Sequence, residues 1–306
     1  MARRARRKRN AKKKVQNTYR EDEIKKSRPD SKPALIALLL VVILIGSGLY
    51  LTSMVDTDDE NPINPGYGVN AELITNNHKT EPGGETDFVL WVENTGTVTD
   101  TFTVSIKSND GGFNIDIEDG YKTIILSKES RKPLIINVKI PSSSEGLLHA
   151  YLEVVSGGDA NERADVRINV NAEEKFGNQT VIGDSLNVHY AGILASDARL
   201  FDTSMEELWD NYMHRRAGVT NSQKHTDTIA SENIGCIGKD NPSDNCEETK
   251  RMIDGFDSKT IGMYEGQTLA VRIAAKDAYG AQQNPDDPDG LAGYDLIFII
   301  NVASII

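Results

Sequence analysis

The sequence is poor in cysteine and in aromatic residues, and it has only one long apolar run. Two cysteines in 306 residues exclude a small fold held together by several disulfides. The 25 glycines fall far below the one residue in three that a collagen-like chain needs. Polytopic membrane proteins need several apolar stretches of about 20 residues, so a single stretch excludes that class as well. The rest of the chain is long enough for two domains of ordinary size.

Charge is distributed unevenly along the chain. Residues 1–33, called the basic arm, contain 14 Lys and Arg and four Asp and Glu, which gives a charge of +10. Since the formal net charge of the whole chain is −12, the remainder carries −22. Basic clusters bind nucleic acid or anionic lipid. We favour lipid and expect no nucleic-acid partner, because an apolar run follows the arm and Tyr19 is its one aromatic residue. Its low hydrophobicity predicts disorder.

The apolar run covers residues 34–55 and contains 22 residues without a charge. At about 1.5 Å per residue, a helix of this length spans about 33 Å, close to the ~30 Å hydrocarbon core of a bilayer. A cleaved signal peptide is the alternative, but its apolar region usually has about 7 to 15 residues. We therefore expect a single-pass anchor in the cell membrane. The basic arm before the run and the acidic residues after it predict a cytoplasmic N-terminus and extracytoplasmic C-terminal domains.

Residues 56–67 are acidic and contain Pro62 and Pro65, which predicts a stalk. From 68 to 173 the sequence is a series of short alternating runs, such as Phe88, Leu90 and Val92, separated by turn residues. About seven strands are expected, arranged as an antiparallel β-sandwich. His78 and His149 are isolated in this region and are expected at turns or on the surface.

The segment EPGGETDFVLWVENTG at 81–96, followed by DTFTV at 100–104, resembles immunoglobulin-like CARDB domains and related bacterial and archaeal surface sandwiches. The resemblance implies a fold and brings no catalytic residues with it. The expected role of residues 68–173 is therefore that of a spacer or an adhesion module.

Five motifs follow in residues 174–306: GDSLNVHYAG at 183–192, LFDTS at 200–204, MIDGFD at 252–257, IGMYEGQ at 261–267 and DAYG at 277–280. In this order they resemble FKBP-type peptidyl-prolyl isomerases. The residues themselves favour an antiparallel half-barrel wrapped on a short helix, placed at about Phe256–Met263. Leu269, Val271 and Ile273 alternate as in a strand buried on one face, and the run 296–302 is apolar enough for a strand covered on both faces. The whole chain is thus predicted to be mainly β, with an α+β C-terminal domain.

The resemblance implies a pocket that speeds rotation about X-Pro bonds without any cofactor. Amide resonance sets this barrier at about 18–20 kcal/mol. The twisted transition state has lost that resonance and its polarity, so an apolar aromatic pocket favours it over the solvated planar amide. Phe256 is the implied floor, and the backbone N–H of Ile253 and the hydroxyl of Tyr279 are implied to hold substrate carbonyls. The implied walls and border are Tyr190, Phe201, Phe298 and Asp202. The alternative is that these aromatic residues are ordinary core. The expected partners are proline-containing polypeptides.

The sequence departs from the family in three places. An insert at 205–251 begins with a predicted amphipathic helix, in which Ser204 and Glu207 fit a capping box and Met205, Leu208, Trp209 and Tyr212 share one face. The family's Phe-x-Phe strand is not recognisable at 246–251, and residues 282–290 replace its apolar flap. A surface binding or scaffold protein that keeps the isomerase fold without activity is therefore the second hypothesis.

Several smaller features complete the set of candidate sites. Cys236 and Cys246 are predicted to form a disulfide outside the cell, closing an 11-residue loop. A zinc site with His214 and His225 is the alternative, at unusual spacing. Asp286, Asp287 and Asp289 lack the spacing of a calcium loop and favour a solvated loop. Asn178 begins a glycosylation sequon, NQT.

Overall fold

The computed structural model describes residues 66–306 except 174, 215–228, 232–233, 235–251 and 284–289. The predicted basic arm, the anchor at 34–55, all but the last two residues of the stalk, and the pair Cys236 and Cys246 lie outside the described residues. Within the described part of the chain, no helix is long and apolar enough to cross a membrane. Residues Ile63–Ile306 form one compact unit.

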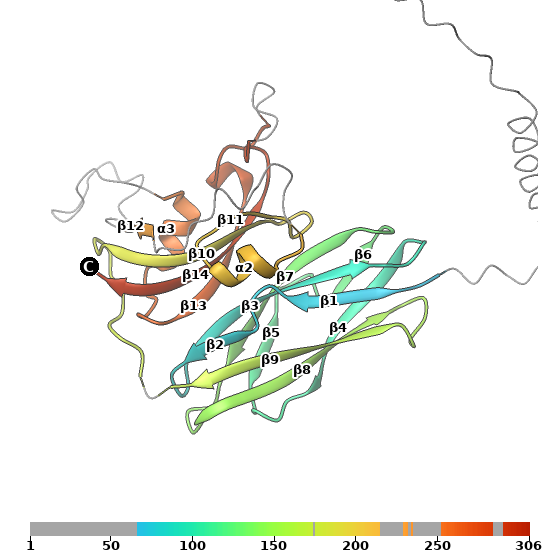
Figure 1. Ribbon diagram of the computed structural model, residues 1–306, viewed down its shortest axis with the longest axis horizontal. Coiled ribbons are helices and arrows are strands. Elements are labelled where there is room, and N and C mark those ends of the chain that lie inside the picture. The colour runs from blue at the N-terminus through green and yellow to red at the C-terminus, as the bar shows by residue number, and fades with distance from the viewer. Residues whose placement is uncertain (1–65, 174, 215–228, 232–233, 235–251, 284–289) are drawn as a thin grey trace, which may run out of the picture. The chain divides into compact units, whose positions relative to one another are not determined.

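Nine strands between residues 69 and 172 form two sheets, together called the sandwich (Figure 1). They are β1 (Val69–Leu73), β2 (Asn77–Thr80), β3 (Glu85–Asn94), β4 (Asp100–Ser108), β5 (Asn114–Ile117), β6 (Thr123–Leu126), β7 (Arg131–Lys139), β8 (Gly146–Ser156) and β9 (Arg163–Ala172). The sheet orders are β1-β3-β7-β5 and β2-β9-β8-β4-β6. Strand β2 pairs parallel with β9, so the expectation of about seven strands, all antiparallel, was wrong in number and in this pairing.

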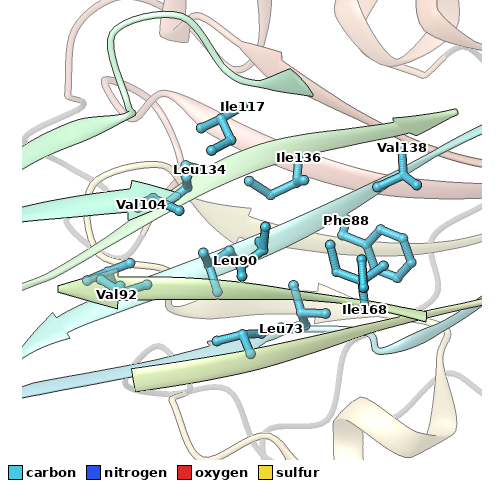
Figure 2. Packing of buried hydrophobic residues seen from close by; sticks show 14 of the residues in the cluster. Leu73, Phe88, Leu90, Val92, Val104, Ile117, Leu134, Ile136, Val138 and Ile168 are labelled. Carbon is cyan, nitrogen blue, oxygen red and sulfur yellow. The ribbon is translucent and has the colours of Figure 1, made fainter. Parts of the chain in front are cut away.

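The two sheets share one apolar core. Phe88, Leu90, Leu134 and Ile136 from one sheet are all 0% exposed, as is Ile168 from the other. Figure 2 shows these side chains lying together between the strands that carry them. Burying one side chain of this size stabilises the fold by roughly 1.5–3 kcal/mol. Since the alternating pattern places such side chains on one face of each sheet, burial of these two faces against each other accounts for the packing of the sheets.

The C-terminal strands form a third sheet that curls into a half-barrel. Its elements are β10 (Leu186–Leu194), β11 (Leu200–Thr203), β12 (Ile229–Ser231), β13 (Thr268–Ile273) and β14 (Leu296–Ile305), with helices α2 (Glu206–Asn211), α3 (Asp254–Thr260) and the 3-10 turn η2 (Ala275–Asp277). The strand order is β11-β10-β14-β13, and β12 also pairs with β10. Residues Leu296 to Ile300 of β14 are buried, so the prediction of a strand covered on both faces is confirmed. The expected mainly β fold class is confirmed as well.

Helix α3 begins and ends earlier than predicted. It covers Asp254–Thr260 instead of Phe256–Met263, because the carbonyl of Ile253 already accepts hydrogen bonds from the N–H groups of Phe256 and Asp257, at 2.9 and 3.0 Å. Gly255 is therefore inside the helix and does not bound it. A Cβ at this position would lie 2.7 Å from a methyl carbon of Ile273, so glycine allows α3 to pack closely on β13.

The predicted capping box at Ser204 was also wrong. Helix α2 starts at Glu206 without a side-chain cap. The Ser204 hydroxyl instead accepts a hydrogen bond from the backbone N–H of Tyr190, at 2.9 Å, and lies 3.3 Å from His189 Nδ1. The apolar face of the helix is as predicted, since Leu208, Trp209 and Tyr212 are buried.

His78 is buried, contrary to the expectation of a turn or surface residue. Its side chain is 5% exposed and its ring stacks on Phe88, with the ring centroids 4.1 Å apart. Its ring nitrogens lie 3.0 Å from the hydroxyl of Thr86 and 2.7 Å from that of Thr75. Burial lowers the pKa of His78 to about 3, so the ring is neutral at physiological pH.

The sandwich packs against the half-barrel through the outer face of β3. Val89 and Trp91 point away from the sandwich core, yet they are 0% and 1% exposed, because they join an apolar cluster with the half-barrel. The half-barrel members of that cluster include Ala191, Ile193, Ala270, Ile297 and Ile299. Strand β3 is thus buried on both faces.

Polar contacts from the sandwich also cover the edge strand β13. The N–H of Ala270 donates to Asp87 Oδ2 at 2.7 Å, and the hydroxyl of Thr86 donates to the carbonyl of Thr268 at 2.8 Å. Further along the strand, the Arg272 guanidinium donates to both carboxylate oxygens of Glu118, at 2.6 and 2.8 Å. Backbone groups that an edge strand leaves unpaired are therefore satisfied by the sandwich.

Candidate functional site

Four aromatic rings from four elements meet inside the half-barrel. They belong to Tyr190 on β10, Phe201 on β11, Phe256 on α3 and Phe298 on β14, and are called the aromatic cluster. Phe298 is its centre, with ring centroids 5.3 Å from Phe256, 5.6 Å from Phe201 and 6.3 Å from Tyr190. Two of these three pairs are edge-to-face, an arrangement that aromatic pairs prefer. The structure thus brings together four residues that are far apart in the sequence.

A glycine on β10 makes room for one of these rings. A Cβ at Gly192 would overlap the ring of Phe201 and would lie 3.0 Å from a ring carbon of Phe298. Any other residue at this position would push Phe201 away from the cluster. The glycine of the HYAG motif is therefore a packing requirement of the site, which the sequence alone did not indicate.

Tyr190 is fixed by its hydroxyl and by its backbone. The hydroxyl donates to Asp202 Oδ2 at 2.5 Å, and the carbonyl of Tyr190 accepts from the Thr203 hydroxyl at 2.7 Å. Burial, and then the hydrogen bond and charge of Asp202, raise the pKa of the Tyr190 phenol well above its usual value. The hydroxyl therefore remains a hydrogen-bond donor. Sequence reasoning missed the role of Thr203 and Ser204 in holding this strand, because the same residues also fit a helix cap.

Ile253 and Tyr279 offer hydrogen-bond donors beside the cluster. Ile253 precedes α3 in an extended conformation and packs against the larger apolar core of the half-barrel, which includes Phe256 and Phe298, and no described residue accepts a hydrogen bond from its backbone N–H. Tyr279 is 50% exposed, and its hydroxyl likewise has no partner among the described residues. Burial of its ring and the nearby charge of Asp202 raise the pKa of Tyr279. All seven residues implied by the resemblance therefore lie in one region of the half-barrel.

The chemistry available here is that of an apolar surface with two neutral donors. Phe256, Phe298 and Tyr190 are 0%, 3% and 5% exposed, so their rings are buried by one another and by the other apolar residues of the half-barrel core. Among the residues that the structure describes, there is no group of three His, Cys, Asp or Glu side chains placed to hold a metal ion. Toward solvent the site presents the partly exposed Phe201 ring and the Tyr279 hydroxyl, which can donate to a carbonyl.

Of the remaining candidate residues, only Asn178 and His214 are among those that the structure describes. Asn178 is exposed, and the Thr180 hydroxyl of its sequon is buried and donates to the carbonyl of Thr260 at 2.6 Å. His214 is described, whereas its possible zinc partner His225 lies outside the described residues. The predicted disulfide and the three aspartates at 286, 287 and 289 also lie outside them.

Comparisons with known proteins add no family. No family model and no curated protein matches the chain. Similar solved structures include the PapD-like domain 7 of human CEP192 (15% identity over 36% of this chain and 89% of that one, TM-score 0.27). A FixG-related protein from Vibrio parahaemolyticus matches at 9% identity over 35% of this chain and 96% of that one, with a TM-score of 0.28. A family 123 glycoside hydrolase from Clostridium perfringens matches at 13% identity over 38% of this chain and 29% of its own, TM-score 0.30. Likeness at this level carries no functional argument.

Proposed function

We propose that the protein is a membrane-anchored peptidyl-prolyl cis-trans isomerase of the FKBP type that helps extracytoplasmic proteins to fold. The supporting observation is the aromatic cluster with the Ile253 N–H and the Tyr279 hydroxyl beside it. The order of the five motifs supports the same proposal. The location rests on the apolar run at 34–55 and on the charge difference across it, and the proposed role of the sandwich as an immunoglobulin-like surface domain rests on residues 81–104.

In the proposed mechanism the cluster binds an X-Pro segment and favours its twisted state. The planar amide is the more polar form and is solvated in water, whereas the twisted amide has lost resonance and is better matched to an apolar surface. The Ile253 N–H and the Tyr279 hydroxyl hold carbonyls on either side of the proline, and the Tyr190–Asp202 hydrogen bond keeps the Tyr190 ring in place. Without catalysis this rotation takes tens to hundreds of seconds, so a modest lowering of the barrier is useful.

The test is a refolding assay on a protein whose slow phase is limited by X-Pro isomerisation. The full chain is expected to accelerate that phase. Replacing Tyr279→Phe removes one hydroxyl from an exposed ring and is expected to lower the acceleration about fivefold to tenfold, the effect of one hydrogen bond. The matched control is Tyr151→Phe in the sandwich, which should leave the rate unchanged. No acceleration by the full chain, or equal effects of the two variants, would reject the proposal.

A second candidate is a binding or scaffold protein with the isomerase fold and no activity. The nearly complete burial of Phe256 and Tyr190 favours it, since rings that contact one another leave little surface for a ligand. The missing Phe-x-Phe strand favours it too. Calorimetric titration with a capped proline tetrapeptide separates the two candidates: the isomerase should bind the peptide and accelerate refolding, whereas the scaffold should do neither.

A further inference from the structure

Asp87 is a buried carboxylate of the sandwich, and its partners lie both in the sandwich and in the half-barrel. It is 3% exposed, and its Oδ1 accepts a hydrogen bond from Asn137 Nδ2 at 2.7 Å within the sandwich. Its Oδ2 accepts from the N–H of Ala270 on β13 at 2.7 Å and lies 3.7 Å from Lys259 Nζ on α3. A buried carboxylate destabilises the folded state unless it is paired, so the fold depends on these partners staying in place.

The elements that Asp87 holds are those that carry the candidate site. Lys259 is in the last turn of α3, and the same helix carries Phe256 and begins directly after Ile253. Helix α3 also packs directly on strand β13, because Gly255 lies so close to Ile273 that no side chain would fit between them. One carboxylate therefore contacts the helix directly and also contacts the strand on which the helix rests.

We propose that the sandwich is a positioning element of the half-barrel, in which Asp87 fixes helix α3, and with it Ile253 and Phe256, through Lys259 and Ala270. This gives residues 68–173 a function beyond that of a spacer or adhesion module. The inference rests on the proposed function for its catalytic consequence, but the positioning of α3 is measurable without any activity.

A second sandwich residue provides a matched control. Glu118 also ties the sandwich to β13, through two hydrogen bonds with Arg272, but none of its hydrogen bonds or ion pairs with described residues reaches α3. Loss of either carboxylate charge weakens the same interface. Only loss of the Asp87 charge removes an ion pair with helix α3, the one with Lys259.

The experiment is amide hydrogen exchange of the full chain, read at the peptide that contains Phe256 and Asp257, whose N–H groups bond to Ile253. Asp87→Asn keeps an acceptor for Ala270 and removes the charge that faces Lys259. Both Asp87→Asn and Lys259→Met are expected to speed exchange in α3 about tenfold, and the double variant should exchange no faster than Asp87→Asn. Lys259→Arg keeps the cation and should restore slow exchange.

Glu118→Gln decides between positioning and general loss of stability. It should lower global stability and leave α3 exchange within about twofold of the parent chain. Equal acceleration of α3 exchange by Glu118→Gln and Asp87→Asn, or no change in either, overturns the inference. If Asp87→Asn loosens α3 but the parent chain does not accelerate proline-limited refolding, the positioning stands and the proposed isomerase function fails. If the parent chain is active, Asp87→Asn should lower the acceleration about fivefold, and Lys259→Arg should retain it.

Discussion

The sandwich core and the aromatic cluster are built from different side chains. The buried members of the sandwich core are aliphatic residues and a few phenylalanines, none of which has a polar side-chain atom. The aromatic cluster contains the Tyr190 hydroxyl, which donates a hydrogen bond to the Asp202 carboxylate in a partly buried site. Area burial accounts for the apolar residues of the sandwich core, whereas Tyr190 and Asp202 also depend on hydrogen-bond geometry, as do His78, Thr75 and Thr86 beside that core. The difference is that the candidate site includes a hydrogen-bonded pair, Tyr190 and Asp202, beside its apolar rings, whereas the residues of the sandwich core are apolar.

The largest expected effect on the free energy of unfolding comes from a substitution in the sandwich core. Leu134 is 0% exposed in the sandwich core, so Leu134→Ala should lower the free energy of unfolding by about 2–5 kcal/mol through lost burial and a residual cavity. Urea denaturation followed by tryptophan fluorescence measures it. Leu147 is 61% exposed, and Leu147→Ala should stay within about 0.5 kcal/mol of the parent. Similar losses at the two positions would contradict an area-based account of the sandwich.

An intermediate effect is expected from His78, the polar residue that stacks on the sandwich core. Its folded pKa is about 3 and its unfolded pKa is 6.5, so its contribution to stability is complete above pH 6.5 and is lost as the pH falls from 6.5 toward 3. Within this window the loss is about 1.4 kcal/mol per pH unit. The variant His78→Gln, which can still bond to the hydroxyls of Thr75 and Thr86, should lack this slope.

The measurement is the difference in unfolding free energy between the parent and His78→Gln at several pH values. Burial also raises the pKa of Asp87, but that residue is present in both proteins, so its effect largely cancels. The difference should shrink steadily between pH 6 and pH 4. A difference that does not change with pH would show that folding does not lower the pKa of His78.

The smallest effect is expected at the hydroxyl of the aromatic cluster. Tyr190→Phe keeps the ring contacts and removes the donor to Asp202, which should lower the free energy of unfolding by about 1 kcal/mol. Asp202→Asn keeps an acceptor for the hydroxyl and serves as the control, with a smaller loss. If Tyr190→Phe is as damaging as Leu134→Ala, the two regions do not differ in the way described above.

Much of the strand pattern could be predicted from sequence, and the limits have physical reasons. Alternating residues such as Phe88 and Leu90 predicted their strand, but burial of Val89 and Trp91 depends on a second region packing over them. Strands β1, β2 and β5 have only four or five residues each, so their alternation is too short to give a strong signal. By contrast, β14 is apolar on both faces, and this pattern alone was enough to predict a strand that is covered on both faces.

The same limits apply to the candidate site. Motif order predicted that Tyr190, Phe256 and Phe298 lie together, and whether they act on proline is still a prediction. Asp87 gave no signal, because Ala270, to which it bonds, is 183 residues further along the chain and only the tertiary structure brings them together. Ser204 was assigned to a helix cap because a local pattern fits two different hydrogen-bond partners equally well.

The position of β14 in its sheet has a consequence for synthesis of the chain. This strand lies between β10 and β13 but is the last of the described strands to leave the ribosome, so until then β13 has no strand partner among the described strands and β10 has only β11 and β12. At 5–20 residues per second, the completed sandwich waits on the order of ten seconds. During that interval Val89 and Trp91 lie on an uncovered apolar face, and the nascent chain is most exposed to aggregation there.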